Sequence, residues 1–510
     1  MKETINNSET CEDIKGDPAS IVIFGGSGDL TLKKLIPSLF NLQKRNLLSE
    51  NTYILGVGRT NLDSESYREL IKDALNKSNK EVNKLLEKIY YLNGDYTDKN
   101  LYQNLKIKMD ELDEKHKTNY NRLFYFATPQ IVYMDIIKKL GNNGMLKKTD
   151  TIFPKVIVEK PFGSDFNSSK RLDKELHNYL EEEQIFRIDH YLGKETVQNI
   201  LMFRFANTIF EPIWNYKYID HVQINVTEDL GIGSRAGYFE NSGLLRDMFQ
   251  NHMLQLLALV GMEPPAQLDA ESVRDEKYKL LKSVRPLKVE DINKKIIKGQ
   301  YIEGTINGEK VKAYRDEKNV DPNSQRETYV AAKMYIDNWR WSGVPFYLRS
   351  GKRLKLKNSQ ISIHFKEVPF SIFSKNKLKP HKNILTLNIQ PNEGFSLNLQ
   401  AKQPGSKLCL NDLNMDFRYS EFFDFDPPEA YERLFLDVIL DDQTLFVRSD
   451  AMETSWEIID EILQEWDNNP DILHFYKSGS WGPDISEGLF NEDNWVNPGE
   501  WLYEYFYLWW

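Results

Sequence analysis

Cysteine is nearly absent from this sequence, since only Cys11 and Cys409 occur among 510 residues. Two cysteines so far apart exclude a disulfide framework and a cysteine-rich zinc module. Long hydrophobic runs are missing too: stretches such as residues 256–262 fall far short of the ~20 apolar residues that a membrane-spanning helix needs. The first 20 residues are polar, without the apolar or arginine-rich pattern of a targeting segment. We therefore expect a frayed N-terminal arm on a cytoplasmic protein with no membrane contact.

Basic charge is also scarce. The chain has 66 Lys and Arg residues against 76 Asp and Glu residues, which gives a net charge of −10, and it contains no long basic run. An acidic chain without a basic stripe argues against nucleic acid as a partner. No HExxH motif, His/Cys cluster or EF-hand loop occurs, so we expect no metal site.

The sequence does have the composition of a globular protein, and its apolar residues follow two different patterns. Hydrophobic residues make up 40% and charged residues 28%, which fits a large buried core divided between at least two domains. In the first part, helix-like segments separate short apolar runs, and this alternation predicts βαβ units and a parallel sheet. The runs are IVIF (21–24), YILGV (53–57), IYYL (89–92), LFYFA (123–127) and VIVE (156–159). We predict an α/β Rossmann-like dinucleotide-binding domain over residues 18–195.

The rest of the chain, 196–510, is predicted to be a larger α+β domain for substrate binding and dimerisation. Residues 219–230 and several runs between 298 and 400 alternate like strands, which indicates a large, mostly antiparallel sheet. Residues 244–262 are predicted to form one long buried helix. The aromatic segment WLYEYFYLWW (501–510) is costly to leave in water, so we expect it to dock on the sheet or on a partner subunit.

A glycine-rich turn joins the first predicted strand to the first helix in IVIFGGSGDLTLKKL. Gly25, Gly26 and Gly28 allow a sharp turn and a close approach to phosphate, which a helix N-terminus also favours. The spacing is not the usual G-x-G-x-x-G, and such a turn can also be purely structural. Asp29 would repel a phosphate that it faced, so we expect it to cap the helix.

The second predicted strand, YILGVGRT, ends in Arg59 with no acidic neighbour. An acidic residue at this point grips the ribose of NAD, whereas an arginine accommodates the 2′-phosphate of NADP. Ser27 and Thr60 are candidate hydroxyl donors beside it. We therefore favour NADP over NAD, with a solvated surface arginine as the alternative and NAD use left open.

Two further segments carry groups suited to acid–base chemistry. RIDHYLGKE (187–195) places Asp189, His190, Tyr191 and Lys194 together, and VIVEKPFG places Lys160 at a strand end. Such a donor cluster suits an anionic group such as a phosphate. His252 shares a helix face with apolar residues, so it is either a satisfied core histidine or a general base oriented by a carboxylate.

Together these motifs resemble the glucose 6-phosphate dehydrogenase family, over nearly the whole chain. The similar blocks include FGGSGDL, GVGRT, YFATP, VIVEKPFG, RIDHYLGKE, RAGYF, RDMFQNH, WRWSGVPFYLRSGKRL, IQPNEGF, AYERLFLDV and SGSWGP, the last resembling bacterial members. The resemblance implies oxidation of glucose 6-phosphate at C1 to 6-phosphogluconolactone with NADP, at the entry to the pentose phosphate pathway. It also implies a homo-oligomer, either a dimer or a tetramer.

The resemblance implies residue roles as well. His252 takes the C1 hydroxyl proton and Asp189 orients it, while His190, Tyr191, Lys194 and Lys357 hold the phosphate. Lys160 lies between the substrate and the nicotinamide. The sugar hydroxyls are held by Glu228, Asp247, Lys352 and Gln390. The cofactor positions are Gly25, Ser27, Gly28, Asp29, Leu30, Arg59, Ala127, Pro129, Tyr133, Glu159 and Lys160.

Two alternatives stay open at this point. One is another NADP-dependent sugar oxidoreductase of the glucose–fructose oxidoreductase type, which shares the EKP motif but lacks the RIDHYLGKE block. The other is a nucleotide-sensing regulatory protein that has lost catalysis. The presence of Asp189, His252, Lys160 and Lys194 disfavours the second alternative.

Overall fold

The computed structural model describes residues 14–76, 79–150, 152–373, 380–406, 409–422, 428–469, 472–491 and 493–497. The N-terminal arm up to residue 13 and the aromatic segment 501–510 lie outside these described residues. The predicted docking of that segment therefore stays a prediction. No helix within the described residues is both long and apolar enough to cross a membrane.

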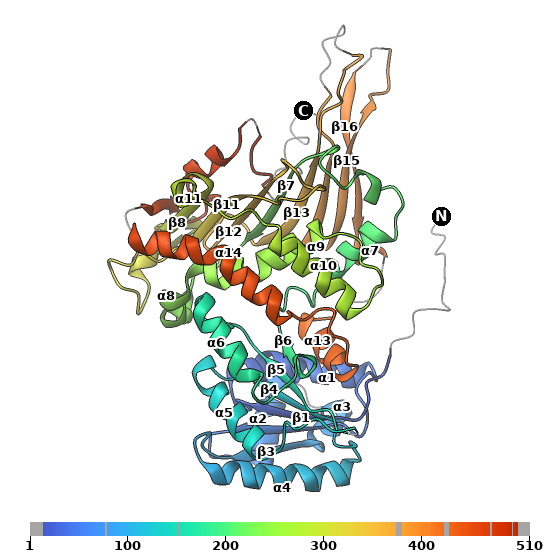
Figure 1. The fold of residues 1–510 in the computed structure, drawn as a ribbon, viewed down its shortest axis with the longest axis vertical. Coiled ribbons are helices and arrows are strands. Elements are labelled where there is room, and N and C mark those ends of the chain that lie inside the picture. The colour runs from blue at the N-terminus through green and yellow to red at the C-terminus, as the bar shows by residue number, and fades with distance from the viewer. Residues whose placement is uncertain are drawn as a thin grey trace.

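The first layer is a six-stranded parallel sheet in the order β3-β2-β1-β4-β5-β6, which confirms the predicted Rossmann-like domain (Figure 1). Each predicted apolar run becomes a strand, because strands covered on both faces need continuous apolar sequence. The strand order reverses between β1 and β4, and the crevice beyond their carboxyl ends is the usual ligand position in such sheets. The strands are β1 (Ser20–Phe24), β2 (Tyr53–Gly58), β3 (Ile89–Asn93), β4 (Arg122–Phe126), β5 (Lys155–Val158) and β6 (Ile185–Arg187).

Helices flank this sheet and begin where the sequence provides caps. The Asp63 carboxylate accepts the Ser66 N–H at 2.8 Å, and Asp165 forms a capping box with Ser168. The helical segments are η1 (Thr31–Leu35), α1 (Ile36–Lys44), α2 (Ser64–Leu75), α3 (Lys80–Leu86), α4 (Lys99–His116), α5 (Gln130–Asn142), α6 (Phe166–Leu176) and η2 (Glu182–Gln184).

The second domain is built on a nine-stranded sheet in the order β16-β15-β14-β13-β7-β12-β11-β8-β17. Only the pairs β7–β12 and β8–β17 in this sheet are parallel, so the predicted mostly antiparallel sheet is confirmed. Its strands are β7 (Ile219–Thr227), β8 (Ile296–Ile302), β11 (Tyr329–Tyr335), β12 (Pro345–Gly351), β13 (Asn358–Phe365), β14 (Ile384–Gln390), β15 (Gly394–Lys402), β16 (Leu410–Arg418) and β17 (His474–Lys477). A separate hairpin pairs β9 (Gly304–Ile306) with β10 (Glu309–Val311).

One face of the large sheet carries a layer of helices, which lies between the sheet and the first domain (Figure 1). The helices are α7 (Glu195–Phe205), α8 (Ala236–Leu244), η5 (Leu245–Met253), α9 (Leu254–Gly261), α10 (Ala270–Lys282), α11 (Val289–Lys295) and α14 (Ser449–Asn468). Short helical segments elsewhere are η3 (Glu211–Ile213), η4 (Gly233–Arg235), η6 (Tyr314–Asp316), α12 (Tyr419–Phe422) and η9 (Asp484–Leu489).

The buried helix predicted over 244–262 is present as one continuous helical run from Leu245 to Gly261, but its first half is π-helix. A kink at Gly243 (φ 68°) ends α8, nine residues of π-helix follow as η5, and α9 continues to Gly261. A side chain at Gly243 would collide with Glu327, whose carboxylate accepts the Leu245 N–H at 3.1 Å. A buried glutamate therefore starts the helix that carries His252, and π-helical turns are frequent at functional sites.

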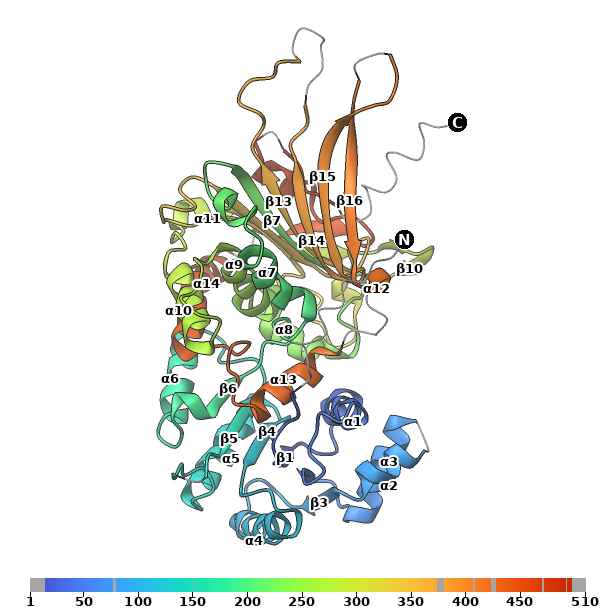
Figure 2. The ribbon, with the colours of Figure 1, turned by 90° about the vertical axis from the view of Figure 1, so that its right-hand side faces the viewer.

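Late in the chain, α13 (Ala430–Ile439) returns to the first domain and packs against α1 (Figure 2). The buried Lys155 ammonium at the start of β5 donates to the Val438 carbonyl at 2.8 Å and pairs with Asp441 at 2.6 Å. The predicted division near residue 195 coincides with the start of α7. After residue 428, however, the chain crosses back to the first domain. As a result, α13 becomes part of the wall of the crevice.

Candidate active site

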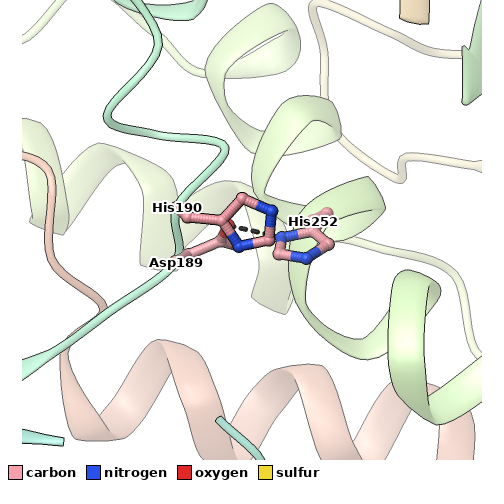
Figure 3. A group of neighbouring side chains, drawn as sticks. All are labelled: Asp189, His190 and His252. Carbon is pink, nitrogen blue, oxygen red and sulfur yellow. Dashed lines mark hydrogen bonds and ion pairs between the residues drawn. The ribbon is translucent and has the colours of Figure 1, made fainter. Parts of the chain in front are cut away.

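Asp189 and His252 come from different domains and meet in the interior. Asp189 follows β6 at the end of the parallel sheet, and His252 projects from η5 beneath the large sheet (Figure 3). His252 Nδ1 and Asp189 Oδ1 form a short hydrogen bond, and both side chains are buried. Asp189 Oδ1 also accepts the Tyr191 N–H at 3.0 Å, which fixes the carboxylate. His252 therefore has the orienting carboxylate that a general base needs.

The other ring nitrogen of His252 faces an ammonium group. Lys160 Nζ lies 2.7 Å from His252 Nε2 and donates to the Asp247 carbonyl at 2.9 Å. Because an ammonium can only donate, the hydrogen-bond network assigns the lone pair to Nε2 and the proton to Nδ1. His252 is therefore held as a neutral base whose accepting nitrogen points at the cavity.

Burial and neighbouring charge act on the dyad in opposite senses. Burial lowers the pKa of His252, and Lys160 lowers it further, although the Asp189 carboxylate opposes both. Burial alone would raise the pKa of Asp189, yet the adjoining His252, His190 and Lys160 hold it well below its ordinary value. Near neutral pH the pair is therefore an ionised carboxylate beside a neutral imidazole, the arrangement that general-base catalysis requires.

A stack of rings leads from the dyad to a second cationic group. The Tyr191 ring stacks on His252 with centroids 4.4 Å apart. The His190 ring meets His252 edge-on, with centroids 4.5 Å apart, and Figure 3 shows these two rings side by side. Lys194 Nζ lies 4.3 Å above the Tyr191 ring and donates to Oε1, the side-chain amide oxygen of Gln390. Burial, with Lys357 nearby, lowers the pKa of Lys194 to about 8. This corner of the site is suited to a doubly charged anion.

The remaining predicted substrate residues form a polar wall beside Lys160. Lys352 Nζ and Glu228 pair at 2.6 Å, and Tyr238 donates to Asp247 Oδ1 at 3.3 Å. Burial would raise the pKa of Asp247, but Lys160 and Lys352 keep it well below its ordinary value. Alternating fixed donors and acceptors of this kind recognise hydroxyl groups.

All these groups, apart from Asp189 behind His252, line one cavity of about 880 Å³, which is within the usual size range of ligand sites. The cavity also reaches the first domain and includes the predicted cofactor residues Leu30, Ala127, Glu159 and Lys160. The structure thus brings the predicted substrate residues and these four predicted cofactor residues into one crevice between the domains. Further cavity residues that the sequence analysis did not single out are Lys34, Thr128, Glu195, Arg235, Tyr238, Met248, Glu393, Pro428, Glu429, Ala430 and Tyr431.

Some of these missed residues did carry a signal. Three blocks of the family resemblance, RAGYF, IQPNEGF and AYERLFLDV, contain Arg235, Glu393 and Tyr431. The resemblance gives these three residues no role. Tyr431 donates to Glu159 Oε1 at 3.0 Å, and Tyr125 donates to the same oxygen at 2.5 Å. Burial raises the pKa of Glu159 in spite of these bonds. Nothing local in the sequence indicates that Tyr431 reaches β5, because that contact depends on the return of α13.

The cofactor half of the crevice is formed by backbone more than by side chains. A Cβ on Gly25 (φ 86°) would lie 2.4 Å from the Ala127 carbonyl, and one on Gly26 would lie 2.7 Å from Gly56. These two glycines serve the packing of the turn against β4 and β2. A Cβ on Gly28 would meet only the Gly25 carbonyl, at 3.1 Å, so Gly28 is the one that leaves open space beside the turn.

Beyond the turn, Arg59 is exposed at the end of β2, and the hydroxyls of Ser27 and Thr60 lie 2.7 Å apart. An acidic group does lie near Arg59 in space: hydrogen bonds from Thr97, with a smaller contribution from Arg59, lower the pKa of Asp95. The Asp95 carboxylate already accepts Thr97 N–H and O–H at 2.7 and 2.6 Å. Arg59 and the two hydroxyls thus place exposed hydrogen-bond donors side by side at the end of β2.

Three other predicted cofactor residues have different surroundings. The expected helix cap at Asp29 is wrong, because this largely exposed carboxylate pairs with Lys33 at 2.9 Å, one helical turn later. Pro129 precedes α5 without lining the cavity, and Tyr133 is buried with its ring stacked on Phe126. These two residues support the carboxyl end of β4 without lining the cavity.

Asp189, His190 and His252 also bring three possible metal-ligand atoms within 4.8 Å of one another (Figure 3). The Asp189 oxygen and His252 Nδ1 are already bonded to each other, and burial together with His252 and Lys160 lowers the pKa of His190 well below its ordinary value. The Lys160 ammonium beside them would repel a cation. The charges favour an acid–base site over a metal centre.

A parallel sheet with a glycine turn, joined to a buried His–Asp pair in a cationic crevice, defines a dinucleotide-dependent oxidoreductase. Two family models match the chain, "Glucose-6-phosphate dehydrogenase, NAD binding domain" over residues 22–199 and "Glucose-6-phosphate dehydrogenase, C-terminal domain" over residues 201–502. The chain belongs to the glucose-6-phosphate dehydrogenase family. This decides against the glucose–fructose oxidoreductase alternative.

Individual relatives agree along almost the whole chain. Glucose-6-phosphate 1-dehydrogenase of Aggregatibacter actinomycetemcomitans is 45% identical over 93% of this chain and 96% of its own length, and that of Bacillus subtilis is 40% identical over 94% of this chain and 98% of its own length. A solved glucose-6-phosphate dehydrogenase in complex with its substrate glucose-6-phosphate superposes with a TM-score of 0.85 at 38% identity, covering 94% of this chain and 98% of that one. The Mycobacterium avium enzyme superposes with a TM-score of 0.82 at 32% identity, over 95% and 99%.

Proposed function

We propose that this chain is an enzyme that oxidises glucose 6-phosphate at C1 to 6-phosphogluconolactone with NADP, the first step of the pentose phosphate pathway. Family membership supports the reaction, and so does the likeness to a structure solved with glucose-6-phosphate. The observation that carries the assignment is the cavity itself. It brings together a carboxylate-oriented histidine and the ammonium groups of Lys160, Lys194, Lys352 and Lys357.

In this proposal His252 Nε2 removes the proton of the C1 hydroxyl. As the O–H electron pair forms the new C=O bond, the hydrogen on C1 leaves with its electron pair. Asp189 keeps the ring in its Nδ1–H tautomer and stabilises the imidazolium that forms. Lys160, bonded to His252 Nε2 and the Asp247 carbonyl, moves its donors to the sugar oxygen when the substrate displaces it from the imidazole.

The phosphate group supplies the anchor for this chemistry. In this proposal the phosphate is held in the corner that His190, Tyr191, Lys194 and Lys357 line, where the two lysines supply the positive charge. Binding energy from a remote phosphate aligns the reacting carbon and lowers the entropic part of the barrier. Free glucose lacks this anchor, so it is expected to be a poor substrate.

NADP fits the other half of the crevice on structural grounds. The open side of Gly28 leaves room for a pyrophosphate, and Arg59 with Ser27 and Thr60 would hold the 2′-phosphate. Leu30, Ala127 and Glu159 line the passage towards Lys160. When bound, the nicotinamide accepts the hydride from C1.

The direct test is NADPH formation, followed by absorbance, with purified protein and glucose 6-phosphate. Free glucose at the same concentration is the matched control. A rate with glucose 6-phosphate that far exceeds the rate with glucose supports the proposal. No rate with NADP or NAD would overturn it and favour the nucleotide-sensing alternative.

We further infer that the protein is a homo-oligomer that associates through the β15–β16 end of the large sheet. Leu413 and Met415 on β16 are 53% and 61% exposed, and they pair with Leu399 and Leu397 on β15. Such an apolar strip on projecting strands favours contact with a second copy. Whether the assembly is a dimer or a tetramer, and whether the protein is cytoplasmic, stay predictions.

A further inference from the structure

A buried lysine close to the dyad has no place in the reaction described above. Lys277 lies in the middle of α10, and its side chain is only 2% exposed. It occupies the apolar stripe of the helix, one turn after Val273 and one turn before Leu280 and Leu281. Among the described residues, none forms a hydrogen bond or ion pair with Lys277 that would offset its removal from water. Burying an unpaired ammonium is costly, so a nearby negative charge is expected.

The packing of α10 directs its buried face towards the segment that carries Asp189. Arg274, three residues before Lys277 on the same face, donates to Gln443 Oε1 at 2.8 Å, and the Gln443 amide donates to the Glu183 carbonyl at 2.9 Å. Phe446 pairs with Ile188, the residue before Asp189. α10 also packs on α9, which continues the His252 helix, and on α14, which packs against that helix.

Asp189 has an atom available for such a partner. Its Oδ1 accepts from His252 and from the Tyr191 N–H, whereas its buried Oδ2 has no hydrogen-bond partner among the described residues. Burial lowers the pKa of Lys277 to about 8, with Asp189 as the charge that opposes the shift and Arg274 as the charge that adds to it. Among the charges of the described residues, the Asp189 carboxylate is therefore the one that favours the charged form of Lys277.

We propose that Lys277 is a positioning residue that provides a second cation for the Asp189 carboxylate and, through it, keeps His252 neutral in the resting enzyme. The dyad has a net charge of −1 when His252 is neutral and zero when it is protonated. A fixed positive charge nearby stabilises the first state relative to the second. Lys160 acts on the dyad in the same sense, Asp247 opposes it, and His190 is neutral beside them.

The test is the acid limb of the pH profile of kcat/KM, measured for the wild type and for Lys277→Met, which keeps the length of the side chain. Without the cation His252 binds a proton more readily, so the limb is expected to move to higher pH by about one unit. The KM for glucose 6-phosphate should be unchanged, because Lys277 does not line the cavity. Lys279→Met on the exposed side of α10 is the matched control and should leave the limb in place.

A folded Lys277→Met protein whose limb coincides with that of the wild type would overturn the proposal, whatever its melting temperature. If this variant does not fold, Lys277→Gln is the second neutral replacement, to be judged by the same limb. The inference rests on the proposed role of His252, and His252→Asn separates the two. Full activity of His252→Asn contradicts the base assignment, whereas an inactive His252→Asn with an unmoved Lys277→Met limb contradicts only the role of Lys277.

Discussion

The two halves of the crevice are built differently. On the substrate side, buried side chains from both domains are bonded to one another before any ligand is present, as in the contacts of His252 with Asp189 and Lys160. On the cofactor side, a backbone turn packs against neighbouring strands, and the charged group Arg59 is exposed. Proton transfer needs fixed geometry and excluded water, whereas cofactor recognition tolerates groups that adjust in solvent.

This contrast explains why substitutions in the two halves should differ in the size and kind of their effects. A change on the substrate side leaves a buried charge without its partner, and it removes a group that acts in the transition state. A change at Arg59 removes a solvent-screened contact that acts on binding. The largest loss of activity is therefore expected from changes on the substrate side.

Replacing His252 with Asn should produce the largest effect. Without the base, kcat is expected to fall by about 10²–10⁴-fold, because the C1 hydroxyl proton has no positioned acceptor. Initial rates at saturating glucose 6-phosphate and NADP measure this loss. His381→Asn, at an exposed histidine of the large domain, is the control and should keep the wild-type rate. A variant that changes only KM would contradict the role of His252.

Lys194→Met should act on substrate binding more than on the chemical step. Loss of a charged hydrogen bond of about 1.5–3 kcal/mol corresponds to an increase in KM for glucose 6-phosphate of roughly 10–100-fold. Lys310→Met on the exposed strand β10 is the control. A fall in kcat alone, with KM unchanged, would show that Lys194 does not hold the phosphate.

The same lysine gives the enzyme a pH-dependent affinity. Because its pKa is lowered to about 8, Lys194 is charged below that pH and loses its charge as the pH rises through it. The wild-type KM for glucose 6-phosphate should therefore rise above about pH 8. The variant, which has no ammonium to titrate, should not show this rise, and an identical rise in both proteins would contradict the assignment.

Arg59→Ala should change cofactor choice with little effect on the chemistry. The ratio of kcat/KM for NADP to that for NAD is expected to fall about tenfold, the size of one screened charge–phosphate contact near 1.4 kcal/mol. Arg171→Ala on the exposed face of α6 provides the comparison. An unchanged ratio would assign Arg59 to the solvated surface and show that the cofactor half depends on its backbone alone.

The smallest effect on activity is expected far from the crevice. The double change Leu413→Lys and Met415→Lys should disrupt the proposed subunit contact, and sedimentation would then show a smaller species while kcat stays within about twofold. Ile107→Lys, at an exposed apolar residue of α4, is the matched control and should leave the assembly intact. An unchanged assembly in the double variant would place the contact elsewhere.

The sequence was sufficient for features that depend on local pattern. The apolar runs from Ile21 to Glu159 predict β1 to β5, because strands covered on both faces must be apolar along their length. The RIDHYLGKE and QNH segments predict the dyad. Asp189 and His252 are hydrogen-bonded to each other, although it is the resemblance to a family, and not their spacing, that pairs them.

What the sequence could not predict depends on contacts between distant segments. The apolar pattern of 244–262 predicts a helix but not its π-helical first half, and the kink at Gly243 just before it packs against Glu327, 84 residues later. The wall formed by Tyr431 depends on α13 crossing back to the first domain. Asp29 has the residue type of a cap, but Lys33 one turn later gives its carboxylate a partner.

The central claim is that His252, held neutral beside Asp189, is the base that removes the C1 hydroxyl proton of the sugar. Its most direct test is the pH dependence of kcat/KM for the wild type and for His252→Asn. Because burial lowers the pKa of His252, the wild-type rate should be retained down to a pH below the usual 6.5 and be lost as the pH falls through that pKa. The residual rate of the variant should lack this limb. A limb at the same pH in His252→Asn would contradict the account.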